Sequence, residues 1–457
     1  MNRRSFIGVS VASLAACSVR RRPDLTADSA TRPRPSPSQL AWHRDEIALF
    51  FHFGVNTFTD REWGDGTENP SIFAPAHLDT RQWARTAKAA GARAMILTAK
   101  HHDGFCLWPT RTTTHSVAAS PWRGGKGDAV REFVDACRAE GLKPGLYLSP
   151  WDRNHPTYGD SPRYNNVYCD QLTELLTLYG DIAEVWFDGA NGEGPNGKRQ
   201  VYDWPRVFGL VRQLQPRAVV FSDAGPDVRW CGNENGTAGD PNWSTVDPSM
   251  VTFPGASGPG VIPALQHGNP HGTVWRPAEV DVSIRPGWFH HPAEDARVRS
   301  VDTLMNLYFT SVGRNGKLLL NVPPTRDGLL HETDVARLTG FRERLAATFE
   351  HDLARDAQST WTVTGPSSAE LVLELREPAT IGIARLEEDI ARGQCVAGYR
   401  LHGETDRSAK VLSGGTTIGH AKLDRFESTK VSRVRLLITD AVAPPERVRM
   451  SLYAAAG

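Results

Sequence analysis

The sequence contains 457 residues, of which 40% are hydrophobic and 23% are charged, so a large buried core is feasible. This length exceeds that of one ordinary domain and suits a barrel followed by a smaller second domain. Lysine plus arginine and aspartate plus glutamate number 52 each, which gives a formal net charge of zero at pH 7. A balanced charge of this kind argues against a polyanionic partner, and we expect no binding of nucleic acid.

The N-terminal 17 residues are expected to be an export signal. Residues 2–6, Asn-Arg-Arg-Ser-Phe, form a twin-arginine pattern, and the apolar run at 7–16 is too short to span a bilayer permanently. The run ends in Leu-Ala-Ala-Cys, which resembles a bacterial lipobox with Cys17 as the lipidated residue; ordinary cleavage by signal peptidase nearby is the alternative. Residues 18–39 are rich in Arg, Pro and Ser and predict a flexible tether. We therefore expect a periplasmic protein or a membrane-anchored lipoprotein, with membrane contact only through a lipid on Cys17.

The remaining cysteines are an odd, scattered set without CxxC spacing. This distribution argues against a disulfide framework and against a structural zinc site. The residues are Cys106, Cys137, Cys169, Cys231 and Cys395.

Residues 40–352 alternate short apolar runs with amphipathic stretches, which is the pattern of repeated βα units. Strands are predicted at 47–53, 94–98, 144–148, 182–187, 218–222 and 318–322. Helices are predicted at 80–90, 128–140, 166–179, 301–312 and 334–349. Residues 223–274 are rich in loops, and eight regular units cannot be counted. We predict the α/β class with an irregular (β/α)8-type barrel, and a doubly wound open sheet is the alternative.

Residues 353–457 have a different pattern, with short alternating strands and no helices between them. Such strands are predicted at 360–364, 371–375, 380–386, 398–402 and 433–439. This part of the chain is therefore predicted to be a β-sandwich that follows the barrel.

Polar and aromatic residues follow successive predicted barrel strands at their C-terminal ends, where barrel active sites lie. The segments are Phe51-His52-Phe53-Gly54, Lys100-His101-His102-Asp103-Gly104-Phe105, Tyr147-Leu148-Ser149-Pro150-Trp151 and Trp186-Phe187-Asp188-Gly189. Such side chains are costly to bury without partners, so we expect them to line a polar pocket with aromatic walls.

The residues of this pocket suit a sugar better than a metal. His101 and His102 are adjacent, so on a regular strand their side chains would point to opposite faces unless a bulge intervenes. The sequence has no HExxH or HxH pattern, and we expect neither a metal nor a cofactor. Imidazoles can exchange hydrogen bonds with ring hydroxyls, and aromatic faces can pack against sugar C–H groups.

Several segments resemble the α-L-fucosidases of glycoside hydrolase family 29. They are residues 51–58 (Phe-His-Phe-Gly-Val-Asn-Thr-Phe), 99–105 (Ala-Lys-His-His-Asp-Gly-Phe), 184–189 (Glu-Val-Trp-Phe-Asp-Gly), 311–316 (Ser-Val-Gly-Arg-Asn-Gly) and 319–324 (Leu-Leu-Asn-Val-Pro-Pro). Residues 229–234 and 283–289 are similar to the branch that prefers α-1,3 and α-1,4 linkages. The resemblance covers the barrel and implies a retaining exo-fucosidase that acts on fucosylated oligosaccharides or glycoconjugates.

The resemblance also implies roles for individual residues. Asp188 matches the catalytic nucleophile. The side chains implied to hold fucose are His52, His101, His102, Trp63, Tyr147 and Trp186. Glu62 is expected either to bind substrate or to support the residues that do. An apolar patch for the methyl group of fucose is expected from Phe53, Phe105 or Trp288.

The sequence leaves two candidates for the second catalytic carboxyl group. Retaining glycosidases use one carboxylate as nucleophile and a second carboxyl group as acid and base. Glu234, in Gly-Asn-Glu-Asn-Gly, resembles the acid/base of the α-1,3/4 branch and is favoured. Glu279 is the rival, and its structural alternative is an ion pair with Arg285 or Arg276.

Two other functions stay open at this stage. The chain could be a surface lipoprotein that binds glycans without cleaving them, or a retaining glycosidase for a related sugar such as galactose. Asp188 with a partner carboxyl favours hydrolysis, because a protein that only binds glycans does not need this pair.

Overall fold

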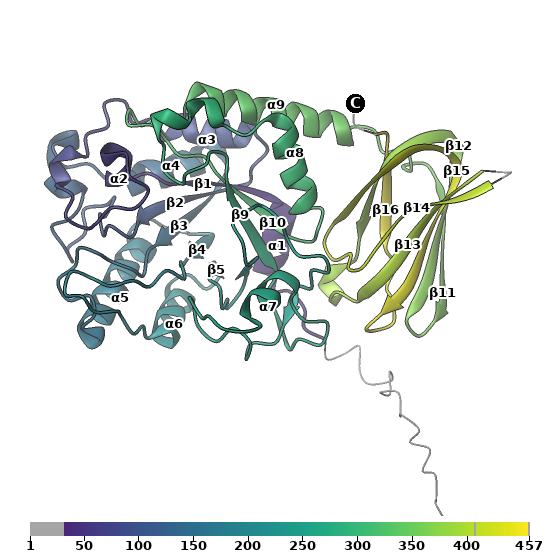
Figure 1. Cartoon of the computed structure of the whole chain (residues 1–457), viewed down its shortest axis with the longest axis horizontal. Coiled ribbons are helices and arrows are strands. Elements are labelled where there is room, and N and C mark those ends of the chain that lie inside the picture. Colours follow the sequence, from purple (N-terminus) through teal and green to yellow (C-terminus); the bar gives the residue numbers. More distant parts are fainter. Residues whose placement is uncertain (1–31, 406–407, 456–457) are drawn as a thin grey trace, which may run out of the picture.

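The chain folds into a barrel domain and a β-sandwich that lie side by side (Figure 1). The structure is a computed structural model that describes residues 32–405 and 408–455. The predicted export signal, Cys17 and most of the predicted tether lie outside the described residues. Within the described ranges, every helix is too short or too polar to cross a membrane.

The barrel sheet has eight parallel strands in the order β5-β4-β3-β2-β1-β10-β9-β6, and most of them are labelled in Figure 1. They are β1 (Ile47–Phe51), β2 (Ala94–Lys100), β3 (Lys143–Leu148), β4 (Glu184–Trp186), β5 (Val219–Phe221), β6 (Arg229–Trp230), β9 (Ala278–Ser283) and β10 (Lys317–Asn321). A parallel bridge between Phe221 and Val228 joins the two edges, so the barrel is nearly closed. The predicted barrel is confirmed, and the open-sheet alternative is wrong.

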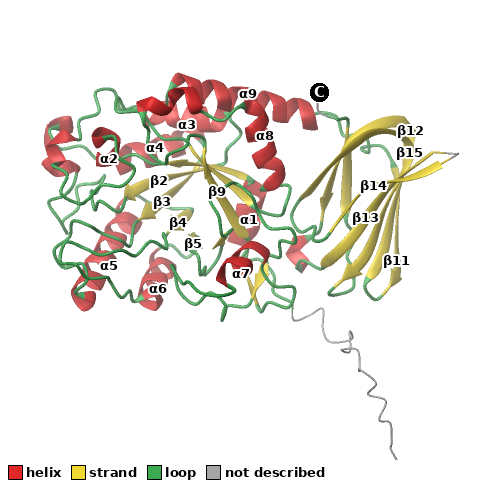
Figure 2. Cartoon of the chain, in the orientation of Figure 1, coloured by secondary structure: helices red, strands yellow, loops and turns green. Residues whose placement is uncertain are grey.

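Helices cover the outside of the barrel (Figure 2). They are α3 (Thr80–Ala89), α4 (Ala129–Glu140), α5 (Ser161–Leu178), α6 (Trp204–Leu214), α8 (Val301–Thr310) and α9 (Glu332–Phe349). Asp128 caps α4 by accepting a hydrogen bond from the backbone N–H of Arg131, and Gly141 ends this helix in the left-handed conformation. The loop-rich stretch contains β7 (Thr245–Val246), α7 (Val261–His267) and β8 (Val274–Trp275), and the short helix α2 (Val55–Thr59) follows β1.

The helix α1 (Pro37–Asp45) closes the N-terminal end of the barrel. Ser36 and Gln39 form a capping box, and the Gln39 amide donates hydrogen bonds to the carbonyl oxygens of Asp227 and Trp275. Residues 37–39 are therefore helical and partly buried, although the sequence predicts a flexible tether up to residue 39. The serine cap followed by proline at the first helical position is the local signal for this earlier helix start.

The C-terminal domain is an antiparallel sheet of six strands that bends around its own apolar core. The strands are β11 (Gln358–Gly365), β12 (Ser368–Glu387), β13 (Val396–Thr405), β14 (Ser408–Gly415), β15 (Lys422–Ala441) and β16 (Arg449–Tyr453). Register shifts lie between Glu374 and Ala379 and between Ile381 and Ile383, within β12. The predicted strands at 371–375 and 380–386 are consequently two halves of one long strand.

Candidate active site

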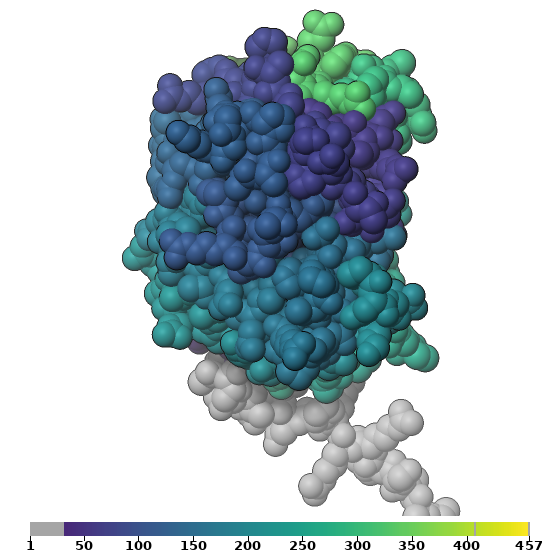
Figure 3. All heavy atoms as spheres, turned by 90° about the vertical axis from the view of Figure 1, so that its left-hand side faces the viewer, coloured from purple at the N-terminus to yellow at the C-terminus, as the bar shows by residue number. Residues whose placement is uncertain are grey.

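The candidate site is a pocket of about 370 Å³ at the C-terminal ends of the barrel strands. This end of the barrel lies away from the sandwich, at the left of Figure 1, and Figure 3 views the molecule from this side. Ten of the predicted site residues line the pocket: His52, Glu62, Trp63, His101, His102, Tyr147, Trp186, Asp188, Glu234 and Trp288. Residues from strands far apart in the sequence are therefore brought together in one cavity.

Asp188 follows β4 and is held by neutral donors. The Tyr147 hydroxyl donates a hydrogen bond to its Oδ2 at 3.1 Å, and the backbone N–H of Ala190 donates to its Oδ1 at 2.7 Å. The Asp188 side chain keeps 27% of its surface exposed, so a sugar in the pocket can reach it. A side chain at the next position, Gly189, would collide with Asp223, so the turn after Asp188 requires glycine.

An aromatic stack fixes the wall beside Asp188. The rings of Tyr147 and Trp186 stack with centroids 5.3 Å apart, and Trp186 stacks on Phe221 at 3.9 Å. The indole N–H of Trp186 donates a hydrogen bond to Glu279 at 3.1 Å. Stacking and this hydrogen bond leave Trp186 little freedom, so Tyr147 is also held in place.

Glu279 lies beneath this wall and does not line the pocket. Its side chain is fully buried 3.5 Å from Lys317, which also pairs with Glu184 at 3.0 Å. Burial, and then the charge of Glu184, raise the pKa of Glu279 well above its usual value. The predicted ion pair with Arg285 or Arg276 is wrong, because Arg285 binds two aspartates and Arg276 donates to a backbone carbonyl.

Glu234 lies in the loop after β6 and faces the cavity. The indole N–H of Trp288 donates a hydrogen bond to its Oε2 at 3.3 Å. Burial raises the pKa of Glu234, and the nearby charges of Asp188 and Glu62 raise it further. Glu234 keeps part of its surface exposed at the rim, but this partial desolvation and the two charges let it retain its proton to higher pH than a glutamate without neighbours does.

His52 is a neutral side chain with a defined tautomer. The Asn321 amide N–H₂ donates to the Ser283 hydroxyl at 2.9 Å and to the Trp288 carbonyl at 2.8 Å, so its oxygen faces His52. His52 Nδ1 therefore carries the proton and donates to that oxygen at 2.9 Å. Burial lowers the pKa of His52 to about 3, which leaves Nε2 as a hydrogen-bond acceptor.

His102 has the same tautomer. The Ser149 hydroxyl donates to the Trp151 carbonyl at 2.7 Å, so it must accept the proton of His102 Nδ1, also at 2.7 Å. Burial lowers the pKa of His102, and its Nε2 lies 4.0 Å from Asp188. The ring of His101 lies 4.0 Å from that of His102, and burial lowers its pKa well below the usual value. These imidazoles can accept hydrogen bonds from sugar hydroxyls.

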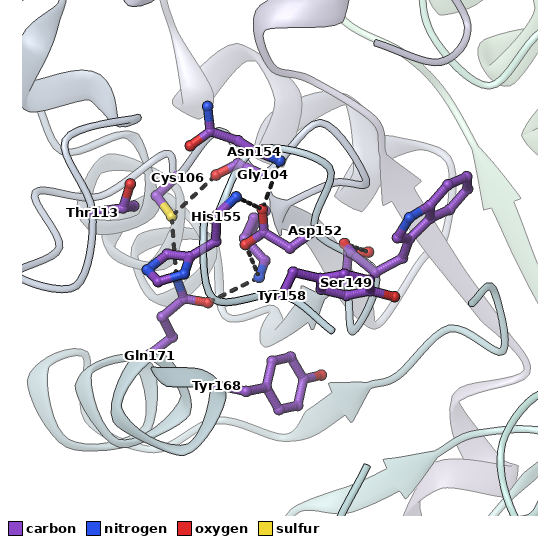
Figure 4. Close-up of polar contacts among 12 residues, drawn as sticks. Gly104, Cys106, Thr113, Ser149, Asp152, Asn154, His155, Tyr158, Tyr168 and Gln171 are labelled. Atoms are coloured by element: carbon purple, nitrogen blue, oxygen red, sulfur yellow. Dashed lines mark hydrogen bonds and ion pairs between the residues drawn. The ribbon is translucent and has the colours of Figure 1, made fainter. Parts of the chain in front are cut away.

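Both adjacent histidines reach the pocket because the end of β2 is irregular. The pairing of β2 with β3 shifts register between Thr98 and Lys100, which is the bulge that the sequence analysis named as the exception. Lys100 points to the other side of the sheet, where its ammonium group donates to Asp152 at 3.1 Å and to Gln171 at 2.9 Å. Asp152 and Gln171 are labelled in Figure 4, and Asp152 also accepts the backbone N–H of His155. This buried network anchors the loop after β3 behind the pocket.

Two loops that each carry a tryptophan form the rim, one exposed and one partly buried. Trp63, 55% exposed, lies on the loop after α2, and Trp288 on the loop after β9. Glu62 joins these loops: its Oε1 accepts the backbone N–H of Trp288, and its Oε2 accepts the N–H of Phe289 and of the His291 ring. In this structure the carboxylate of Glu62 therefore supports the rim.

The sequence analysis missed Asp281, which lines the pocket from within β9. Its carboxyl accepts the indole N–H of Trp230 at 2.9 Å. Burial, and then the charge of Glu234, raise the pKa of Asp281 well above its usual value. The missed signal is a polar residue that alternates with Val280 and Val282, which places it on the inner face of the barrel.

Phe50 and Ala190 also line the pocket and were not predicted, and no local motif distinguishes them. Phe53 and Phe105, proposed for the apolar patch, instead pack into the core outside the pocket. Asp103 accepts the backbone N–H of Phe105 at 2.7 Å and shapes the turn after β2. Of the residues that line the cavity, Trp288 and Phe50 are thus the candidates for the apolar patch.

A (β/α) barrel whose pocket combines several carboxyl groups, neutral imidazoles and aromatic walls is the arrangement of a glycoside hydrolase. In the described ranges, histidine, cysteine, aspartate and glutamate form no cluster of three that could hold a metal ion.

Comparison with known proteins gives the particular family. The family model for α-L-fucosidase matches residues 39–347. The α-L-fucosidase 1 of Arabidopsis thaliana is 43% identical over 92% of this chain and 87% of its own. A glycoside hydrolase 29 family member from an unknown rumen bacterium is 40% identical, with a TM-score of 0.87 over 93% of this chain and 78% of its own. A Ruminococcus gnavus GH29 fucosidase, solved in complex with fucose, is 29% identical, with a TM-score of 0.82 over 94% of this chain and 98% of its own.

The chain therefore belongs to the α-L-fucosidase family, glycoside hydrolase family 29.

Proposed function

We propose that this protein is a retaining exo-α-L-fucosidase that releases terminal L-fucose from α-1,3- and α-1,4-fucosylated glycans. The observation that carries the mechanism is the pair of carboxyl groups in one pocket, Asp188 and Glu234. Asp188 is partly exposed and held by neutral donors, as a nucleophile requires, and the raised pKa of Glu234 suits a general acid.

In the first step, an Asp188 oxygen attacks C1 of fucose. The bond from C1 to the leaving sugar's oxygen breaks, and that oxygen takes the proton of Glu234. A covalent fucosyl-enzyme and a Glu234 carboxylate result. The Tyr147 hydroxyl, which donates to Asp188, helps to orient the attacking carboxylate.

In the second step, Glu234 acts as base. Its carboxylate takes a proton from water, the water oxygen forms a bond to C1, and the bond from C1 to Asp188 breaks. Two displacements at the same carbon return the anomeric centre to its original configuration, so L-fucose leaves as the α-anomer.

The neutral histidines are proposed to hold the sugar hydroxyls. His52 and His102 each present Nε2 to the cavity as an acceptor, because Nδ1 of each is committed to a protein oxygen. Phe50 and Trp288 line the same cavity and supply apolar surface for the 6-methyl group.

The preference for α-1,3 and α-1,4 linkages rests on residues 229–234 and 283–289, which are similar to that branch of the family. In the structure these segments meet, because Trp288 donates a hydrogen bond to Glu234. We propose that both segments contact the leaving sugar, because Glu234 would donate its proton to that sugar's oxygen.

A substrate panel tests the proposal. We expect fucose release from a Lewis-type trisaccharide and little from 2'-fucosyllactose, followed over time. Release from both substrates would support the fucosidase assignment and refute the linkage preference. Failure on both, with hydrolysis of nitrophenyl galactoside instead of nitrophenyl fucoside, would refute the assignment of the sugar.

We further propose export through the twin-arginine signal, with the protein periplasmic or anchored by a lipid on Cys17. Arg32 donates hydrogen bonds to the Pro270 carbonyl at 3.1 Å and to the Gln394 carbonyl at 2.7 Å, where the barrel meets the sandwich. A tether from Cys17 that joins the folded domains at Arg32 would leave the pocket end of the barrel accessible. Fractionation of cells that produce wild-type protein or Cys17→Ser tests the anchor, and a wild-type protein found wholly in the soluble periplasmic fraction would refute it.

A further inference from the structure

His291 joins the two loops that form the rim of the pocket. Its Nδ1 lies 2.8 Å from an Asp60 oxygen, and its Nε2 lies 3.0 Å from a Glu62 oxygen. A carboxylate can only accept, and a neutral imidazole has one N–H, so two such contacts require a doubly protonated ring. His291 is therefore an imidazolium between two carboxylates in this geometry.

The contacts of Glu62 extend this pairing to the acid/base. Besides the His291 ring, Glu62 accepts the backbone N–H groups of Trp288 and Phe289. The indole N–H of Trp288 in turn donates to Glu234 at 3.3 Å. A continuous chain of hydrogen bonds thus runs from His291 through Glu62 and Trp288 to Glu234.

We infer that His291 is a positioning residue, which bridges Asp60 and Glu62 and thereby holds Trp288 against Glu234. This inference rests on the proposed role of Glu234 as acid/base. His291 touches neither the substrate nor the reacting atoms; it acts by fixing the loop that carries Trp288. Loss of the bridge should therefore weaken proton donation to the leaving group more than it weakens binding of fucose.

The charged groups around His291 are consistent with a protonated bridge. Asp60 and Glu62 face it from the loop after α2, and on its own loop the Glu294 carboxylate accepts the backbone N–H of Gly287. Although burial opposes the effect, the hydrogen bonds with Glu62 and Asp60 raise the pKa of His291. The neighbouring Arg61 does not neutralise these carboxylates, since it pairs with Asp65 at 3.1 Å.

Two variants remove the bridge with little change in shape. His291→Gln keeps one donor but no positive charge. Asp60→Asn removes one carboxylate, and asparagine tolerates the left-handed backbone at this position, where φ is 57°. His351→Gln is the matched control, because this histidine follows the C-terminal end of α9, is 82% exposed and contacts only Glu350 among the described ion pairs.

The test compares two leaving groups. With a Lewis-type trisaccharide, whose leaving group needs protonation, we expect kcat to fall about 10-fold in His291→Gln and less in Asp60→Asn. With 4-nitrophenyl fucoside, whose leaving group does not, we expect a change of less than about 2-fold. KM for both substrates and the thermal midpoint should change little, and His351→Gln should match the wild type.

The pH dependence gives a second readout. The pKa of His291 is raised, so its bridge is fully present at low pH and is lost as pH rises through that raised value. The ratio of wild-type to His291→Gln activity should therefore be largest at low pH and approach one at alkaline pH. Equal losses on both substrates, or a ratio that does not change with pH, would overturn the inference.

These outcomes can be separated from failure of the proposed function. If Glu234→Gln shows no dependence on the leaving group, the acid/base assignment is wrong. If Glu234→Gln shows that dependence and His291→Gln retains wild-type activity on both substrates, only the positioning role of His291 is wrong.

Discussion

Two sets of acidic side chains lie inside the barrel, one in its floor and one in the pocket above. In the floor, Lys317 lies 3.0 Å from Glu184 and 3.5 Å from Glu279, and no more than 3% of any of these side chains is exposed. In the pocket, Asp188 is 27% exposed and is held by a tyrosine hydroxyl and a backbone N–H. The floor thus contains a permanent cation as a partner, and Asp188 is left without one.

This difference shows why burial alone does not identify a catalytic acid. Burial raises the pKa of Glu279 and of Glu234 alike. Only Glu234 lines the cavity, whereas Glu279 orients Trp186 from below. Access to the cavity therefore separates Glu234 from the buried carboxyl groups of the floor, which cannot meet a substrate.

The largest effect is expected from Asp188→Asn, which keeps the shape of the side chain and removes the nucleophile. We expect kcat/KM for 4-nitrophenyl fucoside to fall about 10⁴-fold or more. Fucose should still bind in calorimetry, because the pocket is intact. A variant that keeps more than about 1% of wild-type activity would show that another group attacks C1.

The comparison of floor and pocket predicts opposite effects on activity for two substitutions of glutamate by glutamine. Glu234→Gln should lower kcat on a Lewis-type trisaccharide about 10²- to 10⁴-fold, since it cannot give or take the proton. Azide should restore turnover in Glu234→Ala on nitrophenyl fucoside. Glu279→Gln should keep most activity, because its amide oxygen can still accept from Trp186. If the two variants exchange these behaviours, Glu279 is the acid/base.

The variant Lys317→Met tests whether the buried carboxylates of the floor depend on this cation for stability. In Lys317→Met the buried carboxylates lose their cation, and removing one partner of a buried ion pair typically costs about 3–5 kcal/mol. We expect a loss of this size in the free energy of unfolding from urea titration. Arg392→Met, which breaks an exposed pair with Glu446, should leave the free energy of unfolding nearly unchanged. Equal costs for the two variants would mean that the floor charges do not depend on Lys317.

The smallest effect is a displacement of the pH profile. Because the pKa of Glu234 is raised, its proton is retained above the usual range of a glutamate and is lost as pH rises through the raised value. The alkaline limb of kcat/KM should therefore lie above the pKa of an exposed glutamate, about 4.3. This limb should disappear in Glu234→Gln, and its persistence there would assign it to a different group.

The barrel and most pocket residues could be predicted because strand ends carry a local signal. His52, His101 and Asp188 each follow an apolar run, and all lie at the same end of the barrel. Asp281 was missed because its strand, β9, was not predicted, so the alternation of Glu279 and Asp281 with Val280 and Val282 was not used.

The rim depends on contacts between residues far apart in the chain. Glu62 was predicted as a substrate-binding or supporting residue, but its bonds to Trp288 and His291 cross more than 220 positions. No local pattern relates such residues. The predictions at 182–187 and 218–222 correspond to β4 and β5, whereas the two-residue strand β6 has too little periodicity to be recognised from the sequence.

The most direct test of the proposed mechanism is the configuration of the first product. Proton NMR of nitrophenyl fucoside hydrolysis, recorded within minutes and before mutarotation, distinguishes α-L-fucose from β-L-fucose. Double displacement through Asp188 with Glu234 as acid and base predicts α-L-fucose as the first sugar, with the β-anomer appearing only later. If β-L-fucose appears first, water attacks C1 directly, and Asp188 is not a covalent nucleophile.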